Sequence, residues 1–149
     1  MTVLTDHARI LVTGSRTWTD WGLLDTVLMD TWHDAVQDGY PGIHLTHGAC
    51  PDGADSMVGA WAVEHHVPQD PHPADWTAPC PLHCAPGHRR RRRDGTDYCP
   101  TAGPRRNQHM VDLRPLLVIA FHHARSSGTA DCMRRAESAG IPVRRITGA

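Results

Sequence analysis

The sequence contains no lysine, only two glutamates and a single phenylalanine among its 149 residues. The absence of lysine excludes mechanisms that need a lysine amine, such as a Schiff base or a P-loop lysine. Long apolar runs are also absent, since the longest, from Pro115 to Phe121, is far shorter than the ~20 residues of a membrane-spanning helix. The composition therefore excludes a membrane protein, a disordered chain and a coiled coil.

The net charge and the cysteine content exclude further classes of protein. The formal net charge is −1, so the molecule as a whole is not an electrostatic binder of nucleic acid. The N-terminus shows no basic start followed by an apolar stretch, so we expect no secretory signal and a cytoplasmic location. Three of the five cysteines lie between positions 80 and 99, and this clustering favours a metal site over disulfides.

Strand and helix patterns alternate along the chain, which we predict to be a single domain over residues 1–149. Apolar runs predict strands at 8–12, 43–47, 67–72, 116–121 and 143–146. Helical spacing of apolar residues, with glycine or proline at several ends, predicts helices at 21–37, 52–66, 103–112 and 127–139. This alternation predicts an α/β fold in which a parallel sheet carries helices on both faces.

Residues 77–101 break this pattern and are predicted to be an insertion. They hold prolines, three cysteines, histidines and five consecutive arginines, with almost no aliphatic residues. A structureless loop of this length is unusual inside a compact domain, so something other than a hydrophobic core must order it.

Four glycine-bearing loops fall at the predicted strand-to-helix junctions. Such junctions meet at the carboxyl edge of a parallel sheet, where ligands bind. Glycine lets backbone amides approach a ligand closely, and helix N-termini favour anions. Arginine forks and hydroxyl groups also suit phosphate. The loops therefore predict a phosphate-bearing ligand such as a nucleotide, contacted by Gly14, Ser15, Arg16, Gly48, Gly53, Asp55, Gly103, Arg106, Asn107, Ser127, Gly128 and Thr129.

These loop sequences resemble those of a known family. The matching residues are Arg9 to Arg16 with Asp20, His47-Gly48 with 53–55, 75–76, 102–107 with Met110, and Phe121 with 127–129. The set is similar to the YspA, cpYpsA-related branch of the SLOG superfamily, whose members are related to the DNA-processing protein DprA and the LOG phosphoribohydrolases. The resemblance implies a Rossmann-like fold and a pocket for a nucleotide or a nucleotide-derived ligand, such as a nucleotide-sugar phosphate or an ADP-ribose-like molecule.

The resemblance leaves three functions open. Binding or sensing without turnover is favoured, because the catalytic glutamate of the LOG loop falls on Cys132 here. A nucleotide N-glycosidase is the second, with Asp55 or Asp131 as the candidate catalytic carboxylate, although Asp55 could equally cap its helix. Nucleic-acid binding like that of the DprA branch is the third. The sequence also leaves a homo-oligomer open.

The insertion contains a set of residues that suits zinc. Zn²⁺ prefers thiolate and imidazole ligands in a tetrahedral arrangement, and a structural zinc site can supply the folding free energy that this segment lacks. We predict a structural Zn²⁺ ion bound by Cys80, Cys84, His88 and Cys99, with His83 as a spare ligand.

The five arginines at 89–93 admit several interpretations. They form a solvated loop, or an anion clamp folded over the pocket, or a nucleic-acid contact that lacks interleaved aromatic residues for stacking. Elsewhere, the candidate pocket residues are Trp18, Trp21 and Trp76, which could stack on a base, together with His122 and His123. We also predict that Cys50 and Cys132 are buried thiols.

Overall fold

The computed structural model describes residues 6–80, 84, 87–123 and 125–148. Two sheets and four helices follow one another in the order β1 (Ala8–Gly14), α1 (Trp21–Gln37), β2 (Ile43–His47), α2 (Ala54–Glu64), β3 (Gln69–Pro71), β4 (Arg90–Arg91), β5 (Asp97–Tyr98), α3 (Ala102–Asp112), β6 (Leu117–Phe121), α4 (Ser127–Ser138) and β7 (Val143–Ile146). His83, the spare zinc ligand of the sequence analysis, lies outside the described residues.

Five strands form a parallel sheet in the order β3-β2-β1-β6-β7. The central strand β1 pairs on both sides, so that Ile10 lies opposite Leu45 of β2 and Leu117 of β6. Strand order reverses at β1, because the chain first builds outward through β2 and β3 and then crosses to β6 and β7. The carboxyl ends of β1 and β6 therefore form a switch point, where open α/β sheets bind their ligands.

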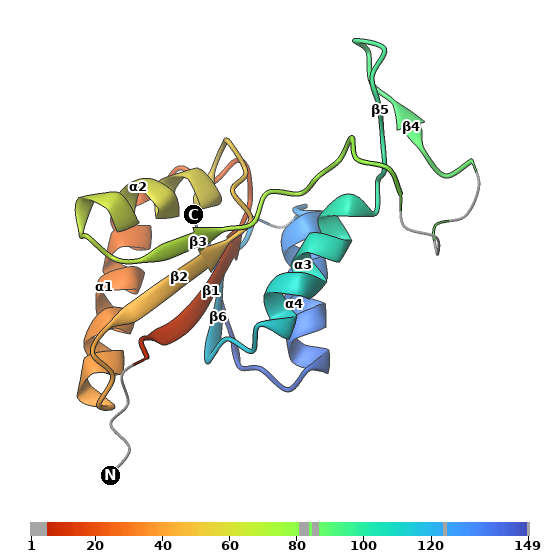
Figure 1. Ribbon diagram of the computed structural model, residues 1–149. Coiled ribbons are helices and arrows are strands. Elements are labelled where there is room, and N and C mark those ends of the chain that lie inside the picture. Colours follow the sequence, from red (N-terminus) through yellow and green to blue (C-terminus); the bar gives the residue numbers. More distant parts are fainter. Residues whose placement is uncertain (1–5, 81–83, 85–86, 124, 149) are drawn as a thin grey trace.

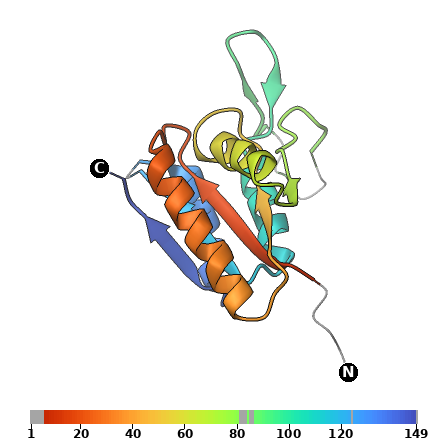
Figure 2. The same ribbon diagram turned by 90° about the vertical axis from the view of Figure 1, so that its left-hand side faces the viewer.

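The helices cover both faces of this sheet, which confirms the predicted fold class. Figures 1 and 2 show α1 and α2 on one face and α3 and α4 on the other. Alternate residues of β1 point to opposite faces, so Ile10 and Val12 pack with the α1–α2 layer while Leu11 packs with α3 and α4. None of the helices in the described part of the chain has both the length and the apolarity to cross a membrane.

Local signals explain the ends of α1. The Asp20 carboxylate accepts a hydrogen bond from the Leu23 amide at 3.0 Å and so caps the first turn. Gly39, just beyond the helix, has a φ of 97°, a conformation that favours glycine. The observed bounds of α1 are those that the apolar spacing predicts.

The edge strand β3 is short and is held by the side chain of Asp70. This carboxylate accepts hydrogen bonds from Arg9 at 2.9 Å and from Thr46 at 2.8 Å, and it contacts the rings of His44 and His72 at 2.8 and 2.7 Å. Partial burial opposes ionisation, but the bonds from His72, Thr46 and Arg9 outweigh it and lower the pKa of Asp70 to about 2. The carboxylate thus joins β1, β2 and β3 along one edge.

Part of the insertion forms a small hairpin, which the sequence analysis did not predict. Strands β4 and β5 pair antiparallel and project away from the sheet and its helices (Figure 1). The Gly95 amide donates to the Arg92 carbonyl at 3.1 Å, and Arg92 donates to the Thr96 carbonyl at 2.8 Å. Gly95 has a φ of 89°, and Asp94 accepts from the Thr96 amide and hydroxyl. These bonds make a tight three-residue turn that Asp-Gly sequences favour.

Candidate functional site

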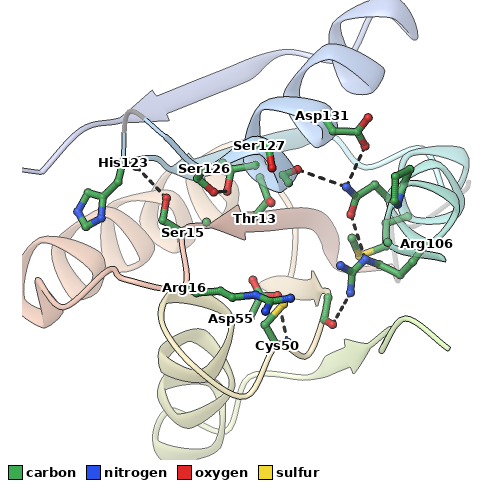
Figure 3. A pocket seen from close by; sticks show the side chains of 18 of the residues that line it. Thr13, Ser15, Arg16, Cys50, Asp55, Arg106, His123, Ser126, Ser127 and Asp131 are labelled. Carbon is green, nitrogen blue, oxygen red and sulfur yellow. Dashed lines mark hydrogen bonds between the residues drawn. The ribbon is translucent and has the colours of Figure 1, made fainter. Parts of the chain in front are cut away.

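A cleft of about 680 Å³ opens at the carboxyl edge of the parallel sheet. Its walls come from the loops after β1, β2 and β6 and from the first turns of α3 and α4 (Figure 3). Every residue predicted to contact a phosphate-bearing ligand lines this cleft except Gly53, and the catalytic candidate Asp131 lines it too. The residues brought together are Gly14, Ser15, Arg16, Gly48, Asp55, Gly103, Arg106, Asn107, Ser127, Gly128, Thr129 and Asp131.

Two glycines let the loop after β1 pack tightly against the start of α2. A Cβ atom on Gly14 would overlap the side chain of Ala54 and come within 3.0 Å of the Phe121 carbonyl oxygen. Gly53 has a φ of 74°, and a Cβ there would overlap the backbone of Ser15 and Arg16. Gly53 therefore shapes the cleft from behind the β1 loop, without lining it.

Arg106 joins three parts of the cleft wall. Its Nη1 donates to the carbonyl oxygens of Gly48 and, at 3.1 Å, of His72. Its Nε donates to Oδ1 of Asn107 at 3.0 Å, and Asn107 in turn donates to Asp131 at 3.0 Å. Since Gly48 follows β2 and His72 follows β3, this guanidinium ties α3 to both loops, and Asn107 ties it to α4.

The cleft carries more arginine than its acidic residues neutralise. Arg16 and Arg125 line it and are exposed, and neither forms a hydrogen bond or ion pair with another described residue. Asp131 is engaged with Arg135 at 2.9 Å and Arg134 at 3.3 Å. Partial burial works against ionisation of Asp131, but bonds from Arg135 and Asn107 outweigh it and lower its pKa. Two guanidinium groups thus remain available to an anion.

The N-terminus of α4 faces this positive region. Ser126 occupies the N-cap position, but its side chain makes no capping bond to a helix amide. Instead its hydroxyl lies 2.8 Å from the hydroxyl of Thr129. Apart from Gly128 itself, its chain neighbours and its own helix backbone, no atom of a described residue lies within 4 Å of where a Cβ of Gly128 would be, and Gly128 lines the cleft. Free first-turn amides and the helix dipole both favour an anion at this place.

Asp55 lies at the opposite wall, close to Cys50 (Figure 3). Asp55 is only 5% exposed. Its Oδ2 accepts a hydrogen bond from the Cys50 amide at 3.2 Å, whereas its Oδ1 has no hydrogen-bond partner among the described residues. Burial raises the pKa of this carboxyl group. Asp55 does not cap α2, because the N-cap is Gly53 and makes no side-chain bond.

The two thiols outside the insertion differ from each other. Cys132 is fully buried, as predicted, and burial raises its pKa to about 11. The prediction for Cys50 was wrong, because this residue is only half-buried and lines the cleft. It lies in a loop ahead of α2, and the loop turns its side chain toward the cleft. Burial and the nearby Asp55 raise the pKa of the Cys50 thiol.

Of the candidate ring residues, His123 and Trp76 line the cleft, whereas Trp18, Trp21 and His122 do not. The His123 ring stacks on Trp18 with centroids 5.0 Å apart, and its Nδ1 lies 2.7 Å from the Thr17 hydroxyl. Sequence reasoning missed Cys50, Thr17, Arg125 and Arg134 in this site. Arg125 and Arg134 flank the 127–129 loop, and counting the charged residues beside that loop would have identified both as candidates.

The four residues predicted to bind zinc meet at the base of the insertion. Their ligand atoms all lie within 4.8 Å of one another, so this group could hold a metal ion. Nε2 of His88 lies 3.0 Å from Sγ of Cys80 and 3.1 Å from Sγ of Cys99, and the sulfurs of Cys84 and Cys99 are 4.0 Å apart. Tetrahedral zinc with thiolate bonds of ~2.3 Å places two sulfurs about 3.8 Å apart. We call these residues the Cys3His cluster.

Donor groups surround the sulfurs of the Cys3His cluster. Arg89 donates to Cys80 at 3.0 Å, and Arg105 donates to Cys99 at 3.4 Å. The hydroxyl of Thr101 lies 2.9 Å from Cys99, and hydrogen bonds from Thr101 and His88 lower the pKa of the Cys99 thiol to about 5. This shift favours the thiolate form of Cys99, which is the form that binds metal. The Cys3His cluster also adjoins the cleft, because Trp76 and Pro100, the residue after Cys99, both line the cleft.

The arginine run does not fold over the cleft. None of the residues 89–93 lines it, and the hairpin that carries them points away from the sheet (Figure 1). Arg89 alone turns inward, toward Cys80 and the carbonyl oxygen of Ala78. The anion-clamp interpretation is therefore not supported by this arrangement.

Comparison with known proteins identifies relatives over most of the chain. The family model described as the YspA, cpYpsA-related SLOG family matches residues 8–78. The Gene 61 protein of Mycobacterium phage D29 is 33% identical over 140 residues, covering 91% of this chain and 93% of the phage protein. The family model ends just before the Cys3His cluster, whereas the likeness to the phage protein continues beyond it.

Proposed function

Since this chain belongs to the YspA, cpYpsA-related SLOG family, we propose that its cleft binds a nucleotide or a nucleotide-derived ligand and acts in binding or sensing. One observation carries the proposal: Arg16 and Arg125 line the cleft without an anionic partner among the described residues, and Arg125 lies just ahead of the uncapped first turn of α4. This combination is suited to phosphate.

The rest of the cleft suits the other parts of a nucleotide. Its volume of about 680 Å³ falls in the range of ~300–1,000 Å³ typical of small-molecule sites. Trp76 offers an aromatic surface for a base, and the unpartnered Oδ1 of Asp55 offers a hydrogen-bonding group for a hydroxyl or an amine. A nucleotide-sugar phosphate or an ADP-ribose-like molecule would use both ends of the cleft.

Calorimetry with AMP, NAD and ADP-ribose tests the proposal. We expect Arg16→Gln to weaken binding by ~1.5–3 kcal/mol, the usual contribution of a charged hydrogen bond. Arg145→Gln is the matched control, because Arg145 is also exposed but lies on β7 and outside the cleft. Mass spectrometry of small molecules released by heat would name a co-purified ligand. Failure of all three nucleotides to bind, with no co-purified nucleotide, would contradict the proposal.

A second candidate, a nucleotide N-glycosidase, is favoured by Asp55 alone. A buried carboxyl group with a raised pKa and one unpartnered oxygen is the kind of group that serves as an acid or base. We expect little release of free base from nucleoside monophosphates or NAD. A turnover number of ~1–1000 per second would reverse this ranking. Asp55→Asn and Asp131→Asn would then identify the catalytic carboxylate.

We also propose that the Cys3His cluster binds a structural Zn²⁺ ion. Its donor set and spacing fit tetrahedral zinc, and Arg89 and Arg105 offset the net charge of three thiolates around a divalent ion. The ion would order an insertion that lacks an aliphatic core, and free thiols of this kind fit a reducing, cytoplasmic setting. Elemental analysis of protein purified without chelator should find about one zinc per chain. Absence of metal would contradict the assignment.

A further inference from the structure

The β4–β5 hairpin carries four arginines that form no ion pair with a described residue. We call residues 90–97 the basic arm. Arg90, Arg91, Arg92 and Arg93 are all exposed, and none forms an ion pair with a described residue. Asp97 pairs with Arg89 at 3.0 Å and Asp94 bonds to Thr96, and the two carboxylates offset only part of the charge of the four arginines, through the nearby Arg91 and Arg92. The arm therefore presents concentrated positive charge on a chain whose formal net charge is −1.

The basic arm is anchored at its base, unlike a freely solvated arginine loop. Arg89 bonds to Cys80 and to the carbonyl oxygen of Ala78, both at 3.0 Å. At the other strand, the Tyr98 ring packs edge-on against Trp76 with centroids 6.1 Å apart, and Arg92 lies 5.0 Å above the Tyr98 ring. His88 and Cys99 of the Cys3His cluster flank the two strands in sequence. The arm is thus held in one orientation, which lowers the entropic cost of binding.

We propose that the basic arm binds the backbone of duplex nucleic acid, with the hairpin lying in the major groove. A two-stranded β-ribbon is one of the two elements that this groove admits. Arginine forks match phosphate geometry and contribute most to sequence-independent affinity. The ring of Tyr98, next to Arg92, also supplies the aromatic neighbour that the arginine run lacks in sequence.

The composition of the arm argues against an anionic membrane as its partner. Between Arg90 and Asp97 every residue is arginine, aspartate, glycine or threonine, so the arm has no apolar side chain to insert below the headgroups. The arm is also separate from the nucleotide site, since none of its residues lines the cleft. The proposal therefore stands whether or not the cleft binds a nucleotide.

Fluorescence anisotropy with a short labelled DNA duplex of mixed sequence tests the proposal, using the full chain as purified with its metal. Affinity should fall as salt rises from about 50 to 200 mM, with a log–log slope near −0.9 per neutralised phosphate. We expect R90Q/R91Q to reduce that slope by about 1.8 and to weaken binding by tens of fold. The matched control R144Q/R145Q removes two neighbouring exposed arginines from β7 and should leave both values unchanged.

Two further measurements separate this proposal from its alternatives. Arg16→Gln, which alters the cleft, should leave duplex binding intact, while zinc content and circular dichroism should show that R90Q/R91Q still folds. The proposal is overturned if R90Q/R91Q binds the duplex as the unaltered protein does. It is also overturned if R144Q/R145Q loses as much affinity, or if the arm is needed only for binding to phosphatidylserine vesicles.

Discussion

Replacing Arg106 with alanine should destabilise the protein as well as weaken ligand binding. From sequence, Arg106 is a phosphate contact. In the structure its guanidinium already donates to the carbonyl oxygens of Gly48 and His72 and to the side chain of Asn107. Truncation would remove these bonds and leave two loop carbonyls without their donor. The Arg106→Ala variant therefore reports on the fold of the cleft wall before it reports on a ligand.

The magnitude follows from those bonds. A hydrogen bond to a charged group contributes ~1.5–3 kcal/mol, but Arg106 is half-buried and water can reach the exposed carbonyls. We therefore expect a loss of about 2–4 kcal/mol in the free energy of unfolding. For a chain of this size each kcal/mol lowers Tm by roughly 2–4 °C, so the fall should be about 4–16 °C.

Thermal unfolding followed by circular dichroism would measure this loss, with Arg145→Ala as the exposed control. Arg106→Lys should give an intermediate value, because one ammonium group cannot reproduce the planar fork that reaches two loops. If Arg106→Ala melts within about 2 °C of the unaltered protein while nucleotide affinity collapses, the bridging role is refuted and Arg106 is a ligand contact only.

Three other perturbations test separate parts of the structure. Gly48→Ala should lower Tm, because its Cβ would overlap the Arg106 guanidinium; an unchanged Tm would mean that the loop can move aside without loss. Chelation at neutral pH should loosen the insertion and so speed tryptic cleavage at the already exposed arginines 90–93, while the far-ultraviolet dichroism of the sheet persists. An unchanged cleavage rate would show that metal does not order the insertion. Asp70→Asn concerns acid stability. The pKa of Asp70 is about 2 in the folded protein, below the ordinary 3.8. The ionised Asp70 carboxylate therefore stabilises the fold fully above about pH 4, and this stabilisation is lost as the pH falls toward 2. Asp70 is 30% exposed, so screening limits this contribution to about 1–2 kcal/mol, and urea unfolding at pH 7 and pH 2 should show the variant losing less stability on acidification than the unaltered protein.

The main sheet and its helices could be predicted because their signals are local. Apolar runs of strand length, helical spacing and glycine stops gave bounds for α1 and β7 that agree with the structure. The group of candidate metal ligands could be proposed for a similar reason, since cysteine and histidine stand out within a segment that has no aliphatic pattern. The structure brings those four side chains together, although their spacing is not that of a standard zinc finger.

Features that depend on contacts between distant segments could not be predicted. The role of Arg106 depends on where the loops after β2 and β3 place their carbonyl oxygens. The position of Cys50 depends on how its loop turns ahead of α2. The β4–β5 hairpin was missed for another reason, because hydrophobic periodicity does not mark a polar ribbon. Its Asp94-Gly95 turn was nevertheless visible in the sequence and would have indicated it.

The insertion occupies the connection that carries the chain from the α1–α2 face of the sheet to the α3–α4 face. This connection leaves β3 at the carboxyl edge and returns through α3, so extra residues placed in it emerge beside the cleft and not beneath the sheet. The pairing register of β1, β2 and β6 does not depend on its length, and the entropic cost of lengthening a loop grows only slowly. The topology therefore gives this fold a position where an accessory module can be added or exchanged next to the cleft while the scaffold stays the same.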